Sequence, residues 1–336
     1  MTGESGSLMG VVFAHSFPRA PTNLVYNARS VLRGALRDHQ LRDESWTSQL
    51  LLGGRNGQRN GFYVASTKAS ERRQILRLLI DESFRLEASS AAFLYLDEES
   101  AAEILSINDD CVPVPAEPDS YIRLREPSLE SYLTDLSSKQ RYDVTRDLRR
   151  AGGYPASHRV QPDDAARIAI YAELAASTQH RHGLPADPGR LANYIARCAG
   201  AGAEAIAFYV GDESSPAAFS LAVVYGDTLW VRMVGMEYGP VGDTSGAYAG
   251  VLIYGPVKWA AERGLANINV GGGVRDFKRR RGAIAEPRWS LIRPPKGIHP
   301  DSSYLARFIR ESAAHFGNSH SPLVDTLITR YENKSE

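Results

Sequence analysis

The feature that most constrains the fold is the passage after the apolar run Ile268–Val270. Three consecutive glycines, Gly271–Gly273, end this run, and a cluster of cations follows them. Glycine adopts backbone angles that other residues resist, and it lets a substrate approach the main chain closely. Cations beside such a turn stabilise negative charge. The passage predicts a strand that ends at an anion site or at a place where negative charge develops in a reaction. The other interpretation is a glycine turn before a solvated basic loop.

Length and composition limit the class of protein. A chain of 336 residues favours two domains or one enlarged domain. Lys plus Arg and Asp plus Glu number 39 each, so any contact with a polyanion has to be local. The two cysteines, Cys111 and Cys198, are too few for a disulfide framework and fit a reducing compartment. We find no signal-peptide pattern and no apolar run of membrane length, so we expect a soluble cytoplasmic protein with no membrane partner.

The order of the segments predicts the architecture. Strand-like and helix-like pieces alternate through the first third of the chain, which indicates a mixed α/β fold. A proline-rich polar break follows, and Ser128 then caps a long helix that runs to about Ala151. A later helix, residues 247–263, contains Pro256, which should kink it because proline lacks the N–H donor. Because the proline-rich break lies just before the helix capped by Ser128, we expect a domain boundary near residues 127 and 128.

Two further residues of the second half are candidates for chemistry. Arg232 lies inside an apolar strand, where a guanidinium needs an anionic partner. That partner could be a substrate carboxylate or phosphate, or an internal salt bridge. Tyr248 begins the helix that faces the glycine passage and could orient a substrate or act as an acid, although such a tyrosine can also be a core residue.

These features together resemble a known family. The segment Leu136–Arg150, the helix between Gly246 and Gly264, the strand entering Gly271–Gly273, and Asp276-Phe277-Lys278 are similar to the Gcn5-related N-acyltransferase (GNAT) superfamily. The whole chain resembles its tandem-domain branch, the Fem-like aminoacyl transferases, which take an amino acid from aminoacyl-tRNA. The resemblance is good over residues 128–295 and schematic over the first 120.

The resemblance implies an α/β (α+β) fold of two GNAT-like domains. We expect these at residues 1–127 and 128–336, each with a mixed, mostly antiparallel sheet flanked by helices, and with the C-terminal helix packing back on the first domain. It also implies an N-acyltransferase that moves an aminoacyl group from tRNA to the amine of a small molecule or peptide, with no tightly bound cofactor.

The resemblance also suggests roles for individual residues. In the Fem-like family a Phe-Lys pair after the last core strand serves catalysis, and the lysine stabilises the oxyanion; Phe277 and Lys278 match it here. Lys278 could instead be one of several exposed cations. With Tyr248 as a third catalytic candidate, the expected substrate contacts are Arg232, Asn269, Gly272, Asp276 and His180. The expected contacts to donor phosphates or tRNA are Lys139, Arg141, Arg146, Arg275, Arg279, Arg280 and Arg281.

Alternative functions stay open. An acyl-CoA-dependent GNAT enzyme would place Gln/Arg-x-x-Gly-x-Gly/Ala between a strand and a helix. Arg197–Gly202 has these letters but follows a helix, and the loop Gly239–Gly246, which has the right place, lacks the leading Gln or Arg. A non-catalytic ligand-binding member is a further alternative. His180 and His182 lack the accompanying ligands of a metal site, so we expect no metal. The sequence predicts neither the acyl group, nor the acceptor, nor the oligomeric state.

Overall fold

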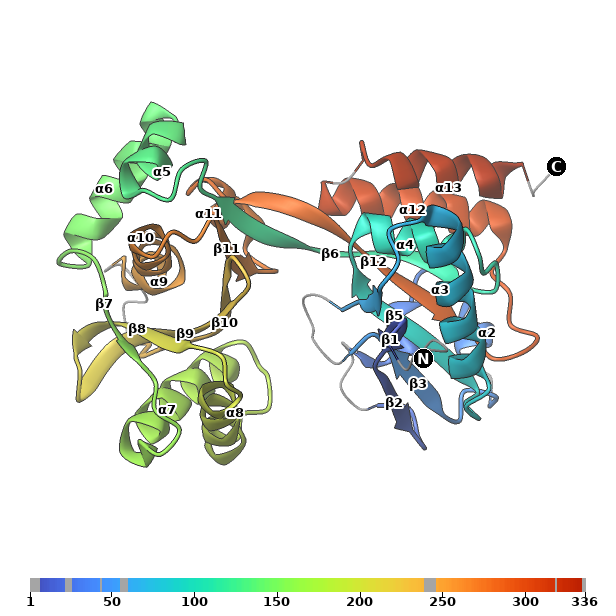
Figure 1. Ribbon diagram of the computed structural model, residues 1–336, viewed down its shortest axis with the longest axis horizontal. Helices are drawn as coiled ribbons and strands as arrows, with labels where there is room; N and C mark the ends of the chain where they lie inside the picture. The colour runs from blue at the N-terminus through green and yellow to red at the C-terminus, as the bar shows by residue number, and fades with distance from the viewer. Residues whose placement is uncertain are drawn as a thin grey trace. The chain divides into compact units, whose positions relative to one another are not determined.

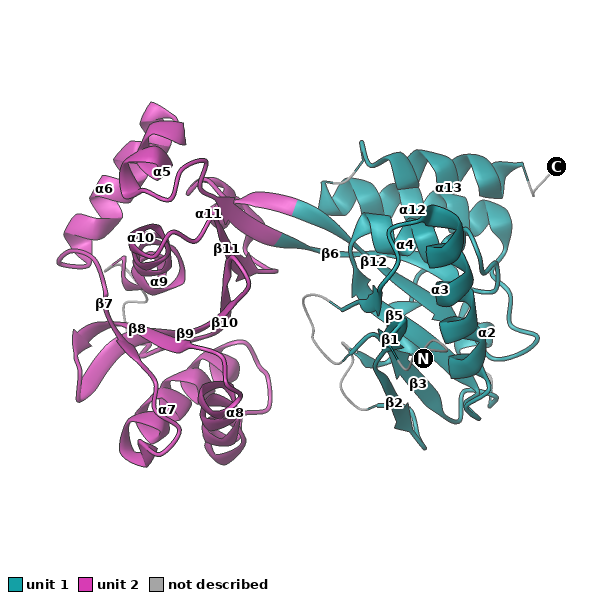
Figure 2. Cartoon of the chain, in the orientation of Figure 1, with its two compact units in different colours: residues 1–119, 286–336 teal, residues 120–285 magenta. Residues whose placement is uncertain are grey.

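The structure is a computed structural model that describes residues 7–21, 26–42, 44–54, 60–238, 246–317 and 319–333. The chain forms two compact units, residues 1–119 with 286–336, and residues 120–285 (Figure 2). The C-terminal residues belong to the first unit, so this division differs from the expected one at residues 127 and 128. As a statement about domains, the expected division stays a prediction. Among the described residues, no helix has both the length and the apolar character that crossing a bilayer requires.

The first unit is a mixed sheet covered by helices (Figure 1). Its strand order is β2–β3–β5–β12–β6, with a separate antiparallel pair β1–β4. The strands are β1 (Gly10–Val12), β2 (Ala14–Phe17), β3 (Gln49–Leu52), β4 (Phe62–Val64), β5 (Ser90–Leu96), β6 (Val112–Arg123) and β12 (Ile284–Arg293). The helices are α1 (Ala28–Val31), α2 (Asp38–Leu41), α3 (Ala69–Phe84), α4 (Glu98–Leu105), α12 (Ser302–Phe316) and α13 (Pro322–Glu332). The helices α12 and α13 share one apolar core with the sheet, through residues such as Leu305 and Leu327.

The second unit has the strand order β6–β11–β10–β9–β8–β7. Its further strands are β7 (Ala156–Arg159), β8 (Ala205–Asp212), β9 (Ser215–Tyr225), β10 (Thr228–Met236) and β11 (Asn267–Gly271). Its helices are α5 (Leu129–Asp135), α6 (Ser138–Arg150), α7 (Ala165–Arg181), α8 (Pro188–Gly200), α9 (Ala247–Ala249), the π-helical turn η2 (Gly250–Tyr254), α10 (Gly255–Glu262) and α11 (Arg275–Arg279). One apolar cluster joins α7 and α8 to the sheet, and a different one joins η2 and α10 to it, so helices cover both faces (Figure 1). The predicted mixed α/β fold is confirmed.

The long helix expected from Ser128 is wrong in one respect, because it breaks in two. Leu136 has an extended backbone, with ψ 144°, and ends α5. Ser137 then starts α6: its side chain accepts a hydrogen bond from the N–H of Gln140, and the Gln140 side chain accepts one from the N–H of Ser137. This reciprocal capping box favours a new helix start over continuation of the old helix.

Pro256 changes the helix that follows residue 246, as expected, but through a π-helical turn. The N–H of Gly255 donates to the carbonyl of Gly250, five residues back. The carbonyl of Val251 therefore has no donor within the helix, because its own partner five residues on is the proline. Ser220, which is fully buried on β9, donates its hydroxyl to this carbonyl at 2.5 Å. A side chain of the sheet thus compensates for the missing N–H, as buried carbonyl groups require.

Candidate active site

The sheet of the second unit opens between β10 and β11. These parallel strands pair only from Thr228–Trp230 to Asn267–Asn269, although β10 continues to Met236. A bulge lies in β10 between Val231 and Met233, so Arg232 is the extra residue. Bulges bend a strand and end its regular pairing, and they often lie beside active sites. The end of β11 therefore diverges from β10 where the three glycines begin.

The glycine passage has the backbone that its composition predicts. Gly271 and Gly273 have φ of 73° and 74°, in the region that glycine adopts without strain. Val274 follows with φ 40°, which is unusual for a β-branched residue. The passage turns the chain directly into α11, which carries Phe277 and Lys278.

Lys278 points back into this turn. Its ammonium donates to the carbonyl of Gly271 at 2.8 Å and also to the carbonyl of Gly272. Only 2% of the residue is exposed. Lys278 is therefore buried and held by main-chain oxygens. It is not one of the exposed cations of a basic loop, which was the alternative interpretation. Its catalytic role stays a prediction.

Two aromatic rings lie beside the turn. Tyr248 and Phe277 have ring centroids 5.0 Å apart at an angle of 53°. Burial, with a smaller effect of Tyr238, raises the pKa of Tyr248 to about 12. The Tyr248 hydroxyl is therefore protonated at neutral pH and can donate a hydrogen bond. Asn269, fully buried in the middle of β11, accepts a hydrogen bond from the N–H of Gly271 at 3.2 Å and so helps to fix the turn.

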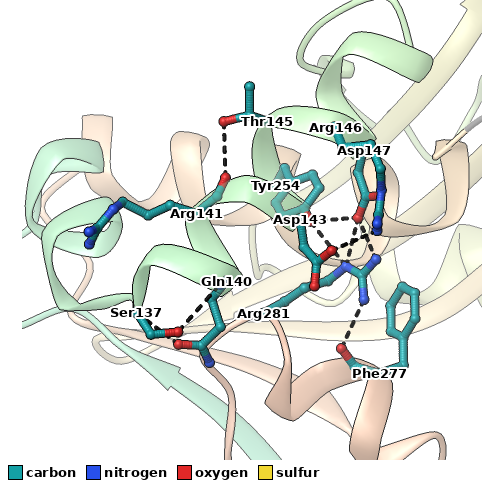
Figure 3. Close-up of polar contacts among 10 residues, drawn as sticks. All are labelled: Ser137, Gln140, Arg141, Asp143, Thr145, Arg146, Asp147, Tyr254, Phe277 and Arg281. Carbon is teal, nitrogen blue, oxygen red and sulfur yellow. Dashed lines mark hydrogen bonds and ion pairs between the residues drawn. The ribbon is translucent and has the colours of Figure 1, made fainter.

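A buried polar network holds α11 in place (Figure 3). Arg281 donates from Nε to Asp147 Oδ2 at 3.0 Å, and its Nη2 also reaches this oxygen. Tyr254 donates its hydroxyl to the same oxygen at 2.9 Å. The guanidinium also donates to the carbonyl of Phe277 at 3.0 Å and lies 3.6 Å from the centroid of the Phe277 ring. The network therefore connects α6, η2 and the residue next to Lys278.

Arg281 differs from its expected role as a phosphate contact. Its side chain is 7% exposed and is ion-paired with Asp147, so it does not lie among the surface cations. Sequence reasoning missed Asp147 and Tyr254 as site residues. Asp147 lies three residues after buried Val144 on α6, so helical spacing already placed it beside the apolar stripe. That spacing was the available signal.

The other expected phosphate contacts of α6 and α11 are the partly exposed, ion-paired Arg146 and several exposed cations, of which Arg279 also forms an ion pair with Asp276. Arg146 is partly exposed and ion-paired with Asp143 at 2.9 Å and with Asp147 at 3.2 Å. The exposed cations of α6 and of the C-terminal end of α11, here called the α6–α11 basic surface although they lie on more than one side of α6, are Lys139, Arg141, Arg149, Arg150, Arg279 and Arg280. The two helices meet where the Gln140 side chain donates to the carbonyl of Arg279 at 2.9 Å. Tyr142, 67% exposed on α6, adds an aromatic ring to this surface.

The expected substrate contacts lie in several places. Asn269 and Gly272 adjoin Lys278, as described. Arg232 is half-buried at the bulge of β10 and donates from Nε to the hydroxyl of Tyr194 on α8 at 3.3 Å. Asp276 is exposed on α11 and ion-paired with Arg279, and Arg275 precedes it at the start of the same helix. His180 is exposed in the last turn of α7 and takes no part in the buried network of Asp147, Tyr254 and Arg281.

Two expectations about donors and metals involve this unit. The loop Gly239–Gly246, which the acyl-CoA alternative concerns, lies outside the described residues except for Gly246. In the described part of the chain, no three or more His, Cys, Asp or Glu side chains are arranged to hold a metal ion. The absence of a metal stays a prediction.

Comparisons with known proteins give one family match and several structural neighbours. Residues 138–279 match the family model of the acetyltransferase (GNAT) domain. Among solved structures, FemX has a similar fold, with a TM-score of 0.51 and 10% identity over 73% of this chain and 80% of FemX. The DUF2156 domain of an Agrobacterium fabrum protein gives a TM-score of 0.49 and 12% identity, over 73% and 77% of the two chains. A tandem GNAT protein from clavulanic acid biosynthesis gives 0.40 and 11%, over 73% and 74%. No curated protein sequence matches the chain.

Proposed function

We propose that this protein is an acyltransferase whose acyl donor is an aminoacyl-tRNA. Residues 138–279 match the family model of the acetyltransferase (GNAT) domain, which confirms the predicted superfamily for this segment. The observation that carries the choice of donor is the α6–α11 basic surface. It presents six exposed cations and the exposed ring of Tyr142 on α6 and at the end of α11. The helix α11 follows the Lys278 turn directly, and α6 contacts it through Gln140. Basic side chains with an interleaved aromatic ring are typical of nucleic-acid contacts. The fold likeness to FemX is compatible with this proposal.

In the proposed reaction, the amine of a small molecule or peptide attacks the carbonyl carbon of the aminoacyl ester. The new C–N bond forms, the ester C–O bond breaks, and the amine proton ends on the ribose hydroxyl that is released. Lys278 stabilises the oxyanion of the tetrahedral intermediate. Its ammonium is already fixed by the carbonyls of Gly271 and Gly272, so little reorganisation is needed when the charge develops. Binding both reactants beside this turn supplies much of the rate. The reaction is a biosynthetic amide-bond formation and belongs in the cytoplasm, where charged tRNA is made.

Acyl-CoA is the second candidate donor, because the matching family model describes an acetyltransferase domain. The two donors differ in how they would engage the protein. A tRNA contacts many cations, so its affinity falls steeply as the salt concentration rises. Each phosphate contact adds about 0.7 to 0.9 to the slope of the logarithm of the binding constant against the logarithm of the salt concentration. An acyl-CoA enzyme would bind acetyl-CoA without RNA and release free thiol.

The test is filter binding of charged and uncharged total tRNA across a salt series, beside calorimetry with acetyl-CoA. We expect salt-sensitive binding of tRNA and no heat with acetyl-CoA. The variant Arg149→Gln/Arg150→Gln should lower the salt slope by about 1.5, since it removes two cations of the α6–α11 basic surface. The charge-matched control is Arg73→Gln/Arg77→Gln on α3, whose cations are also exposed. Heat with acetyl-CoA and no tRNA binding would reject the proposed donor.

Replacing Lys278 tests the proposed mechanism. For Lys278→Ala we expect kcat to fall by about 100-fold to 1000-fold, the usual cost of one lost oxyanion partner. Donor affinity should change by less than about threefold, because the ammonium faces the turn and not the α6–α11 basic surface. Single-turnover amide formation gives the rate, and donor binding with the urea midpoint reports whether the variant is folded. Near-normal turnover in a folded variant would contradict the role of Lys278. If the wild-type protein left every donor unchanged, the non-catalytic alternative would be favoured.

A further inference from the structure

The first unit contains a cavity of about 630 Å³ that the reaction described above does not use. The helices α1 and α2, the turn between them and one residue of β5 line it. The lining residues are Arg29, Ser30, Val31, Arg33, Asp38, Leu41, Arg42 and Tyr95. Cavities of about 300 to 1,000 Å³ suit small molecules. This one is much larger than a single inorganic ion needs.

The cavity is positively charged. Its described lining contains three arginines and one acid, Asp38. Arg42 approaches Asp38 at 3.9 Å, but both side chains are about four-fifths exposed or more, so this pair contributes little. Neither Arg29 nor Arg33 forms an ion pair with any residue in the described part of the chain. Arg29 and Arg33 therefore line a ligand-sized space in which Asp38 is the one acid among the described lining residues.

Tyr95 brings an aromatic ring to the cavity through a strained backbone. Its φ is 57°, in the left-handed region, although it lies within a strand. In the pairing of β5 with β12, two residues of β5, Leu94 and Tyr95, lie opposite one residue of β12. Tyr95 therefore belongs to a bulge. Asn60 holds this bulge, because its side chain donates to the carbonyl of Leu94 and its N–H donates to that of Tyr95. A left-handed non-glycine residue costs about 1 to 3 kcal/mol, and bulges re-aim side chains next to binding sites.

Burial is the main cause that raises the pKa of Tyr95 to about 12, and Tyr26 and Glu117 add to it. The hydroxyl is therefore protonated at neutral pH. Tyr95 therefore lines the cavity as a neutral phenol and not as a phenolate that would repel an anion.

We propose that this cavity binds a phosphorylated small molecule with a flat aromatic group, with Arg29 and Arg33 on the phosphate and Tyr95 against the aromatic group. Guanidinium groups bind phosphate through paired, charge-assisted hydrogen bonds, and two of them match its double charge. A flat group on the Tyr95 ring would bury apolar area and add aromatic stacking. The site lies wholly in the first unit and does not depend on the acyl donor proposed for the second.

The test is calorimetry on the full chain with phenyl phosphate, inorganic phosphate and benzoate at constant ionic strength. We expect phenyl phosphate to bind more tightly than either of the other two. Arg29→Gln/Arg33→Gln should weaken phenyl phosphate by at least about tenfold, as the loss of charge-assisted hydrogen bonds implies. The matched control is Arg73→Gln/Arg77→Gln on α3, which changes the net charge equally and should leave binding unchanged.

A second variant separates the ring from the charge. Tyr95→Gly removes the aromatic ring at a position whose φ suits glycine, so the fold should be retained. We expect it to weaken phenyl phosphate several-fold and to leave inorganic phosphate unchanged. The proposal is overturned if the wild-type protein binds no phenyl phosphate, if the α3 control loses as much affinity as Arg29→Gln/Arg33→Gln, or if Tyr95→Gly affects both ligands equally.

Discussion

Removing the carboxylate of Asp147 should destabilise the second unit strongly. Asp147 is 4% exposed, and its Oδ2 accepts hydrogen bonds from Arg281 and Tyr254. In Asp147→Ala the guanidinium of Arg281, itself 6% exposed, stays buried without its countercharge. Breaking a buried pair in this way costs about 3 to 5 kcal/mol. Since domains are stable by about 5 to 15 kcal/mol, much of the stability of the unit should be lost.

Urea denaturation measures this effect as a fall in the unfolding midpoint. The double variant Asp147→Leu/Arg281→Met replaces both charges with apolar groups, so it should cost less than Asp147→Ala alone. The control is Glu262→Ala on α10, which breaks the exposed pair with Lys258 at 3.8 Å and should cost less than about 0.5 kcal/mol. A loss below about 1 kcal/mol in Asp147→Ala, or a double variant worse than the single one, would refute the reasoning.

Two other predictions concern the core and the pH dependence of the second unit. Ser220→Ala leaves the buried carbonyl of Val251 without a donor, so the free energy of unfolding should fall by about 1 to 3 kcal/mol, and an unchanged urea midpoint would contradict this. Burial, with the charge of Arg167, lowers the pKa of His158, although Glu213 at 3.6 Å opposes the shift. The unfolded chain therefore binds the proton of His158 more readily than the folded chain. The free energy of unfolding should be highest at neutral pH and should fall as the pH drops through about 6.5, the pKa of an unperturbed histidine. His158→Gln should lose less stability than the wild type between pH 7.5 and pH 5; equal losses would exclude His158 as the cause.

The sequence by itself determined the strand that ends at Gly271–Gly273. The signal is local, because an apolar run stops at glycines, whose freedom at positive φ is a property of the residue type. The class of enzyme was implied by a family resemblance that includes the Phe-Lys pair after these glycines. The effect of Pro256 was equally readable, because the missing N–H is covalent chemistry. Ser220, the donor that replaces this N–H, comes from a distant strand. Its role could not be predicted from the sequence.

The tertiary structure alone decided which cations are buried and which are exposed. Lys278, Arg279, Arg280 and Arg281 are consecutive, and charge patterning treats them alike. One turn of α11 directs Lys278 to the glycine carbonyls and places Arg281 against Asp147, while Arg279 and Arg280 stay exposed. The partners lie 6 to 7 residues away in one case and 134 in the other. Desolvation depends on what packs around a side chain, and that is fixed only when distant segments meet.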